Sequence, residues 1–321
     1  MNLFPTLHGV TSSVIRPDGS TESCMLGESN EIPTACGTLI PRWGEENVRR
    51  KHIPALTFYP NGALKAVSLE EQTTVLTPLG EYPAEFVTFY ASGAVCRVFP
   101  VNGKISAYWS EEEERELCPT LQFRLPCGAF CARVTAIHFY ESGALRSIAL
   151  WPGESIVLRT NVGMVATRCG FALYENGALE SVEPPHPLPV ETPIGVLSAF
   201  DVDALGLHGD VNSMSFYPDG AFRSVTTSSD RIEVILPDRA AVIYGPAERP
   251  DPLIDDRTVI TPLRVAFDEQ GNVTLNNGSD KGTYPLDGCC FRALTQEGKS
   301  TASLRQSPMT CGDCSTCNMC G

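Results

Sequence analysis

The chain has 321 residues, enough for one long domain or two, and its formal net charge is −14. A strongly acidic surface repels phosphate backbones, so nucleic acid is not an expected partner. The start, Met1-Asn2-Leu3-Phe4-Pro5, lacks a basic region and a long apolar core, and no apolar run is long enough to span a bilayer. We therefore expect a cytoplasmic protein with no transmembrane segment.

A short phrase recurs along the chain and predicts its architecture. It consists of an aromatic or leucine residue, tyrosine, two turn residues, glycine, alanine and an apolar residue. Apolar residues alternate with other residues before each turn, which predicts a strand with one buried face. The positions expected to be buried are Leu56/Phe58, Val87/Phe89, Ile137/Phe139, Phe171/Leu173 and Met214/Phe216. The positions between them, Thr57, Thr88, His138 and Ser215, are expected to be more exposed.

Each copy of the phrase is predicted to be a β-hairpin. The two residues before the glycine, such as Pro60-Asn61 or Glu141-Ser142, suit the centre of a type I turn. The glycine then fits the left-handed position of a bulge, where a Cβ atom is costly. We expect positive φ at Gly62, Gly93, Gly143, Gly177 and Gly220.

Further strands and degenerate copies complete the array. A strand ending at a Pro or Gly turn is predicted at residues 75–80, 190–195 and 259–263, and a weaker version at 157–160. The spacing from Gly62 to Gly93 leaves room for about three ordinary strands. Degenerate copies at residues 15–19 and 267–271 flank the series, as the end units of a stacked array require.

The fold class that follows is all-β, with stacked antiparallel hairpins in a solenoid-like or rolled sheet. A β-propeller is the alternative, although its blades need four strands. The Tyr-x-x-Gly-x-Leu hairpins resemble MORN-type repeats, a resemblance that implies a scaffold for a membrane or a protein partner. The copies here are unevenly spaced and lack the glycine-dense second half of a MORN unit.

Two further features have a structural and a functional interpretation. The acidic run at residues 111–116 is predicted to be a solvated insertion or a short exposed helix, and otherwise a site for an ion or a basic partner. The repeated tyrosines share the parity of the polar positions. They form either a stabilising ladder over the turns or an aromatic interaction surface. They are Tyr59, Tyr90, Tyr140, Tyr174 and Tyr217.

The 13 cysteines are odd in number and irregularly spaced through the body, which argues against a disulfide framework. Four of them are interpreted as core thiols: Cys24, Cys36, Cys96 and Cys169. Cys118, Cys127 and Cys131 lie close together in sequence, and Cys289-Cys290 is a vicinal pair. Burial is favoured over metal ligation for each of these.

The end of the chain carries the most specific chemical signal. Cys311, Cys314, Cys317 and Cys320 recur at every third position. The spacing is similar to that of ferredoxin-type [4Fe–4S] ligands, although the fourth cysteine comes one residue early and Gly follows it in place of Pro. Cys320, or a body cysteine such as Cys289 or Cys290, would complete the cluster. Zinc or another soft metal, redox-active thiols and a tail without a cofactor remain the alternatives.

The sequence thus divides into a hairpin-repeat body at residues 1–297, a small polar linker at 298–308 and a Cys-rich metal-binding tail at 309–321. The scattered histidines form no legible catalytic motif, and no phosphate-binding loop is present. We expect a scaffold whose tail binds an iron–sulfur cluster or another metal for electron transfer, sensing or metal delivery. The alternative is a non-catalytic protein-interaction scaffold with no cofactor. A protein partner is expected in either case.

Overall fold

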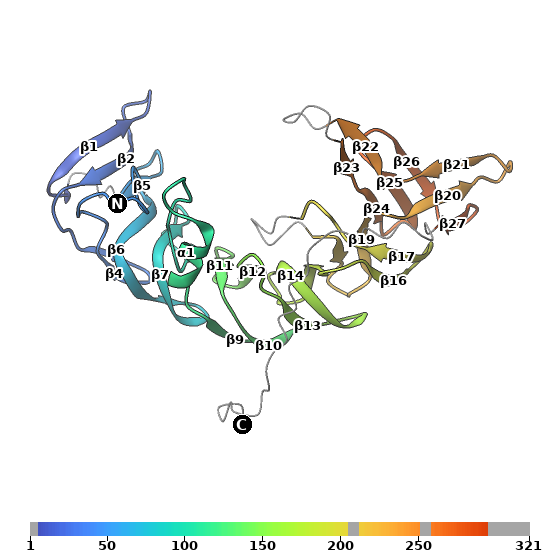
Figure 1. Cartoon of the computed structure of the whole chain (residues 1–321), viewed down its shortest axis with the longest axis horizontal. Coiled ribbons are helices and arrows are strands. Elements are labelled where there is room, and N and C mark those ends of the chain that lie inside the picture. Colours follow the sequence, from blue (N-terminus) through green and yellow to red (C-terminus); the bar gives the residue numbers. More distant parts are fainter. Residues whose placement is uncertain (1–5, 205–211, 251–257, 295–321) are drawn as a thin grey trace.

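A computed structural model of the chain describes residues 6–204, 212–250 and 258–294. This part is all-β apart from the helix α1 (Glu111–Leu117). Figure 1 shows the hairpins arranged in an open arc, with β1 on one arm and β22 and β23 on the other. No helix in the described ranges is both long enough and apolar enough to cross a membrane.

The main sheet has 16 strands, and neighbours along it are antiparallel. Its strands are β1 (Val10–Ile15), β2 (Thr21–Leu26), β5 (Leu56–Phe58), β6 (Leu64–Thr77), β7 (Gly80–Phe89), β8 (Val95–Phe99), β11 (Val134–Phe139), β12 (Leu145–Leu150), β13 (Ile156–Thr160), β14 (Gly163–Leu173), β15 (Leu179–Glu183), β18 (Met214–Phe216), β19 (Phe222–Thr227), β24 (Leu263–Phe267), β25 (Asn272–Asn276) and β26 (Lys281–Pro285). The predicted stack of hairpins is confirmed. The sheet is continuous and open, unlike the separate blades of a propeller.

Smaller hairpins branch from this sheet. They are formed by β3 (Ile32–Thr34) with β4 (Gly37–Leu39), β9 (Leu121–Leu125) with β10 (Gly128–Ala132), β16 (Leu188–Thr192) with β17 (Gly195–Ala199), β20 (Arg231–Ile235) with β21 (Ala241–Tyr244) and β27 (Cys290–Leu294), and β22 (Ala247–Pro250) with β23 (Thr258–Thr261). Aromatic contacts join one of them to the main sheet: the ring of Phe130 on β10 lies edge-on to Phe171 on β14, with centroids 6.0 Å apart. The smaller hairpins therefore extend the core of the main sheet into a second layer.

The repeat glycines adopt the predicted left-handed conformation. Their φ angles are 78° at Gly62, 91° at Gly93, 92° at Gly143, 82° at Gly177 and 88° at Gly220. In each turn the glycine N–H donates to the tyrosine carbonyl, and the tyrosine N–H donates to the carbonyl of the following alanine. The register of each hairpin shifts at this point, as a bulge requires. The hairpin interpretation of the repeated phrase is confirmed.

The repeat tyrosines link each hairpin to the next. Every tyrosine hydroxyl donates a hydrogen bond to the carbonyl that precedes the next copy's turn, at 2.8 to 3.0 Å. The pairs are Tyr59–Phe89, Tyr90–Phe139, Tyr140–Leu173, Tyr174–Phe216 and Tyr217–Phe267. In the first degenerate copy Arg16 replaces tyrosine, and its guanidinium donates to the Phe58 carbonyl. The ladder is thus a structural device, while a role in recognition stays a prediction.

We expect Tyr90→Phe to lower the free energy of unfolding by about 1 kcal/mol, because a half-buried carbonyl loses its hydrogen-bond donor while the packed ring stays. The matched control is Tyr108→Phe, since Tyr108 is 82% exposed. Urea unfolding of both variants measures the difference. Equal stability of the two variants would show that the ladder contributes nothing.

One face of the main sheet is a continuous apolar row. The strand register aligns one residue from each of the strands β2, β5 to β8, β11, β12, β14, β15, β18, β19, β24 and β25. None is more than 2% exposed: Cys24, Leu56, Val67, Val87, Val98, Ile137, Ile148, Phe171, Val182, Met214, Val225, Val265 and Leu275. The five predicted inward pairs are all buried, and those on this row join the hairpins into one core.

The opposite face carries a row of small and polar residues, and here the sequence prediction is partly wrong. Thr57 and Thr88 are half-buried, but His138 is 6% exposed and Ser215 is 4% exposed. One pair of neighbouring hydroxyls on this face satisfies each other across the strands, because the Ser215 and Ser224 oxygens lie 2.6 Å apart. Connecting segments also cover this face, as the Asn212 side chain donates to the Ser181 hydroxyl at 2.8 Å. The face is therefore polar and yet buried.

The third predicted element forms a second kind of hairpin. Residues 75–80, 157–163 and 190–195 each end a strand, turn and begin its antiparallel partner. In each turn the threonine hydroxyl donates to the glycine carbonyl three residues on. Residues 259–263 are the exception, because β23 runs into β24 without this turn. The expected three strands between Gly62 and Gly93 are instead two long ones, β6 with 14 residues and β7 with 10.

Candidate binding site at the N-terminal end of the sheet

The main sheet begins at an exposed edge strand. All six residues of β1 are exposed, and β2 is the only strand of the described residues that pairs with it. Val14 and Ile15 are more than half exposed, at 54% and 52%. Strand β2 differs sharply, since Cys24 and Leu26 belong to the core. The hydrophobic core thus ends at β2, and β1 extends beyond it with both faces accessible to solvent.

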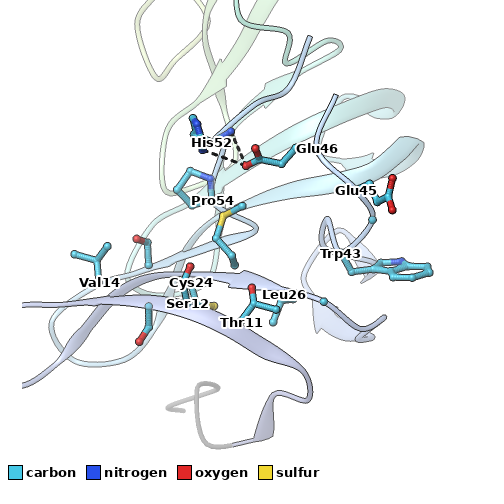
Figure 2. Close-up of a pocket in the computed structure, with 15 residues that line it drawn as sticks. Thr11, Ser12, Val14, Cys24, Leu26, Trp43, Glu45, Glu46, His52 and Pro54 are labelled. Atoms are coloured by element: carbon cyan, nitrogen blue, oxygen red, sulfur yellow. Dashed lines mark hydrogen bonds and ion pairs between the residues drawn. The ribbon is translucent and has the colours of Figure 1, made fainter. Parts of the chain in front are cut away.

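A cleft lies between the β1–β2 hairpin and the loop at residues 43–54. Its volume is about 590 Å³. Figure 2 shows Ser12 and Val14 on the strand side, and Trp43, Glu46 and His52 on the loop side. The remaining lining residues are Thr11, Ser13, Ser23, Cys24, Met25, Leu26, Gly27, Gly44, Glu45 and Pro54. The cleft therefore combines an apolar floor, several hydroxyls, one indole and two carboxylates.

Two contacts to strand β6 hold the loop in place. The Glu70 carboxylate accepts hydrogen bonds from the backbone N–H groups of Trp43 and Gly44, at 2.8 and 3.1 Å. The Arg50 guanidinium donates to the carbonyls of Leu69 and Glu70. Arg42 is also buried and donates to the Arg50 carbonyl. These bonds fix the backbone of the loop although Trp43 itself is 41% exposed.

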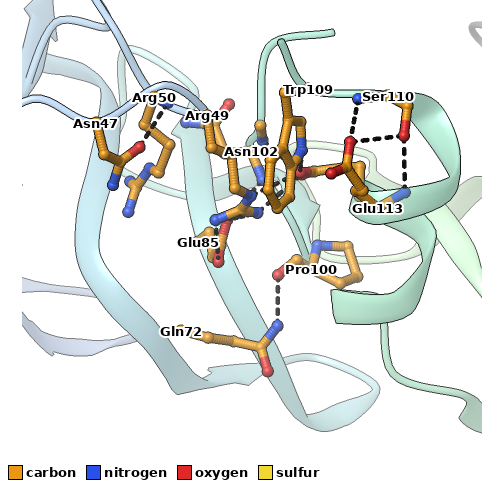
Figure 3. Close-up of polar contacts among 12 residues, drawn as sticks. Asn47, Arg49, Arg50, Gln72, Glu85, Pro100, Asn102, Trp109, Ser110 and Glu113 are labelled. Carbon is orange, nitrogen blue, oxygen red and sulfur yellow. Dashed lines mark hydrogen bonds and ion pairs between the residues drawn. The ribbon is translucent and has the colours of Figure 1, made fainter.

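A buried ion-pair cluster anchors the far side of the same loop (Figure 3). Arg49 lies between Glu85 on β7 and Glu114 on α1, and its nitrogens approach both carboxylates to 2.6 Å. Glu114 also accepts hydrogen bonds from the Gly103 N–H at 2.6 Å and the Trp109 indole at 2.7 Å. Burial alone would raise the pKa of Glu114, but the hydrogen bonds from Arg49, Trp109 and Gly103 outweigh it and hold the pKa below the usual value.

The acidic run at residues 111–116 is therefore only partly solvated. It forms the predicted short helix, which begins with a capping box between Ser110 and Glu113. Glu111, Glu112 and Glu116 are exposed, but Glu114 is 3% exposed and faces Arg49. The expectation of a wholly exposed run is wrong at Glu114, because an arginine far away in sequence supplies its partner.

In and beside this loop, the arginine side chains and the exposed glutamate side chains point in different directions. Arg42, Arg49 and Arg50 point into the protein, where carbonyls or carboxylates satisfy them. Glu45 and Glu46 are exposed and line the cleft. No lysine or arginine is among the described residues that line it. The cleft is consequently acidic as seen from solvent, and it favours a cationic ligand.

A contact between Glu46 and His52 lies at the rim of the cleft (Figure 2). The Glu46 carboxylate lies 3.3 Å from His52 Nδ1 and accepts the His52 backbone N–H at 2.9 Å. His52 holds a left-handed backbone, with φ of 56°. Its side chain is 73% exposed, and no serine, threonine or cysteine among the described residues hydrogen-bonds to it. The pair shapes the rim of the cleft and does not form a nucleophile–base arrangement there.

The body cysteines among the described residues fall into three groups: buried, exposed and half-buried. Cys24, Cys36, Cys118 and Cys127 are buried, and burial raises the pKa of Cys24 and of Cys118 to about 11. These thiols are protonated at neutral pH and are poor ligands. Cys131 and Cys290 are exposed. Cys96 and Cys169 are half-buried and not core thiols as expected. Cys169 lies in a bulge with φ of 64°, and its sulfur contacts the Ala204 carbonyl at 3.3 Å.

The described residues contain no group of three or more His, Cys, Asp or Glu side chains placed to hold a metal ion. The predicted ligands Cys311, Cys314, Cys317 and Cys320 lie outside the described residues, as does the linker at 298–308. Cys289 is half-buried and Cys290 begins β27. The structure brings neither of them near the cleft residues that line the N-terminal site.

Sequence reasoning did not find the cleft or the ion-pair cluster. The only available signal was the run Arg49-Arg50-Lys51-His52 beside Glu45-Glu46, which reads as a mixed surface segment. It also missed a turn at residues 236–240, where Arg239 takes the glycine position with φ of 69°. Comparisons of the chain with protein-family models, curated protein sequences and solved structures find no match. The fold itself defines the class: an open, all-β array of hairpin repeats.

Proposed function

We propose that this chain is a repeat scaffold whose C-terminal cysteines hold a thiolate-bound metal centre, with an iron–sulfur cluster as the first candidate and zinc as the second. The observation that carries the proposal is the unbroken three-residue spacing of Cys311, Cys314, Cys317 and Cys320. Such a centre would serve electron transfer, sensing or metal delivery. We place the protein in the cytoplasm, where thiols stay reduced.

The properties of the body thiols support this assignment. The four buried cysteines are protonated and packed among apolar side chains, so they favour a structural role. Cys289 and Cys290 lie at the start of the last described strand, and the rest of the chain continues from that strand. They remain the body cysteines best placed in the sequence to complete a site formed by the tail.

A protein-interaction scaffold without a cofactor is the second candidate. The acidic cleft favours it, because a loop held by hydrogen bonds to Glu70 presents an exposed indole and two carboxylates to solvent. Extended repeat arrays commonly bind partners along their surfaces. The two candidates differ in one respect that is simple to measure, namely whether the chain holds a metal.

We expect removal of the tail to abolish metal binding. The full chain and a chain ending at Pro308 are purified without oxygen, reconstituted with iron and sulfide, and compared by metal analysis and visible absorption. The full chain should be brown from thiolate-to-iron charge transfer, whereas zinc would leave it colourless. Cys131→Ser is the matched control, since Cys131 is an exposed body thiol. Equal metal content in the full and shortened chains, or none in either, would contradict the proposal.

A further inference from the structure

We propose that the N-terminal cleft binds an extended, basic peptide segment of a partner protein, which adds as a further strand to the edge of β1 that no described strand occupies. The proposal concerns the opposite end of the array from the Cys-rich tail, and it holds whether or not that tail binds a metal. It rests on three points: the exposed edge strand β1, the alternating directions in which the side chains of an added strand would point, and the distribution of charge around the cleft.

The two ends of the main sheet differ in how they are protected. Edge strands attract other strands, and proteins commonly block them with charges or proline. Strand β26 carries Lys281 and Pro285 and is flanked by Asp280 and Asp287. Strand β1 reads Val-Thr-Ser-Ser-Val-Ile, with no charge and no proline. Its pairing with β2 is regular at Ser12, Ser13 and Val14, which offers a short stretch for a further strand.

A strand added beside β1 would point alternate side chains toward the cleft. The cleft has a volume of about 590 Å³, enough for more than one side chain. Val14 supplies an apolar wall, and Trp43 and Glu45 lie on the loop side (Figure 2). An indole face and carboxylates together favour a lysine or arginine side chain, through cation–π attraction and charge-assisted hydrogen bonds.

The charge distribution argues for a basic partner over a second copy of this chain. The three arginines of the loop are occupied inside the protein, and its remaining cation, Lys51, is exposed but does not line the cleft, so Glu45 and Glu46 set the charge there. Two copies meeting at β1 would bring the same acidic clefts together on chains that each carry −14. Like charges at an interface disfavour association, whereas opposite charges speed and direct it.

A random library of peptides about eight residues long, near the upper range of strand lengths, is selected on the full chain. We expect the recovered sequences to carry Lys or Arg at alternate positions and to lack proline between them. In fluorescence anisotropy, a recovered peptide should bind the variant Glu45→Lys/Glu46→Lys about tenfold more weakly or worse. The control Glu81→Lys/Glu191→Lys changes two exposed glutamates on distant hairpins by the same total charge and should bind as the unmodified chain does.

Backbone N-methylation of the peptide tests strand addition without altering the protein. Methyl groups on alternate amides should abolish binding, and those on the intervening amides should have little effect. Neutral or acidic recovered peptides, no recovered peptide, equal binding to the cleft and control variants, or no alternation with N-methylation would each overturn the proposal. Light scattering that shows a dimer sensitive to Glu45→Lys/Glu46→Lys would assign the edge to a second copy instead. Unchanged circular dichroism of each variant confirms that the fold is retained.

Discussion

Gly170→Ala is expected to lower the free energy of unfolding by about 4 kcal/mol or more, the combined scale of overpacking and backbone strain. A Cβ atom at this position would lie 2.1 Å from the Ile148 carbonyl oxygen, which belongs to the neighbouring strand β12. Gly170 also has φ of 136°. The methyl group would therefore force β12 and β14 apart in the middle of the continuous sheet, where both apolar and polar rows are buried.

The matched control for this prediction is Gly177→Ala. Gly177 has φ of 82°, but nothing lies within 4 Å of the position its Cβ would take. This variant should lose about 1–2 kcal/mol, the cost of a left-handed backbone alone. Urea unfolding of both variants at neutral pH gives the comparison, with the slope of each transition checked for two-state behaviour. Similar losses of unfolding free energy in the two variants would show that strands β12 and β14 accommodate the methyl group at Gly170.

The repeat phrase specified the inner hairpins well because its information is local. Alternating residues such as Leu56 and Phe58 determine a buried face, and a glycine such as Gly62 determines the turn. The same local logic predicted the second kind of turn at Thr77 and Thr192. It failed to predict the length of β6, because the pairing of β6 with β7 continues past a register shift between Ser68 and Thr73 that has no sequence signal.

Features that depend on distant residues were not predictable. His138 and Ser215 occupy polar positions of their strands, and alternation alone places them toward solvent. Both are nonetheless buried, and Ser215 pairs with Ser224 of the neighbouring strand, a contact that no local pattern records. Gly170 is a further example. Its sequence neighbours do not reveal the close approach of Ile148, which arises from pairing between β12 and β14.

The candidate cleft could not be predicted from the sequence for the same reason. Its two walls come from β1–β2 and from residues 43–54, and only the folded loop separates Arg49 and Arg50 from Glu45 and Glu46. The sequence shows charges of both signs side by side. In the structure Arg49 and Arg50 form hydrogen bonds inside the protein, whereas Glu45 and Glu46 are exposed to solvent. The acidic character of the site is therefore a consequence of folding, which places Arg49 between Glu85 and Glu114 inside the protein.

Arg49→Met is expected to lower the free energy of unfolding by about 3–5 kcal/mol, because it leaves two buried carboxylates without their shared cation. The side chains of Glu85 and Glu114 are 8% and 4% exposed, so water cannot replace the guanidinium fully. Arg115→Met is the control. Arg115 is 37% exposed and lies 3.3 Å from Glu154, and its loss should cost about 1 kcal/mol or less. Equal losses in the two variants would contradict the assignment of the cluster as a stabilising centre.

The pH dependence separates this electrostatic effect from lost packing. In the unmodified chain the pKa of Glu114 is lowered from its ordinary value of 4.5. Its stabilising contribution is therefore present above about pH 4.5 and is lost as the pH falls through the folded-state pKa. In Arg49→Met burial without a cation disfavours the charged form of Glu114, so the variant recovers stability as the pH falls toward about 4.5, before the unmodified chain begins to lose it. The difference between the two chains should narrow as the pH falls from 7 to about 4, as measured by urea unfolding at each pH. A difference independent of pH would mean that Arg49 stabilises the loop by packing alone.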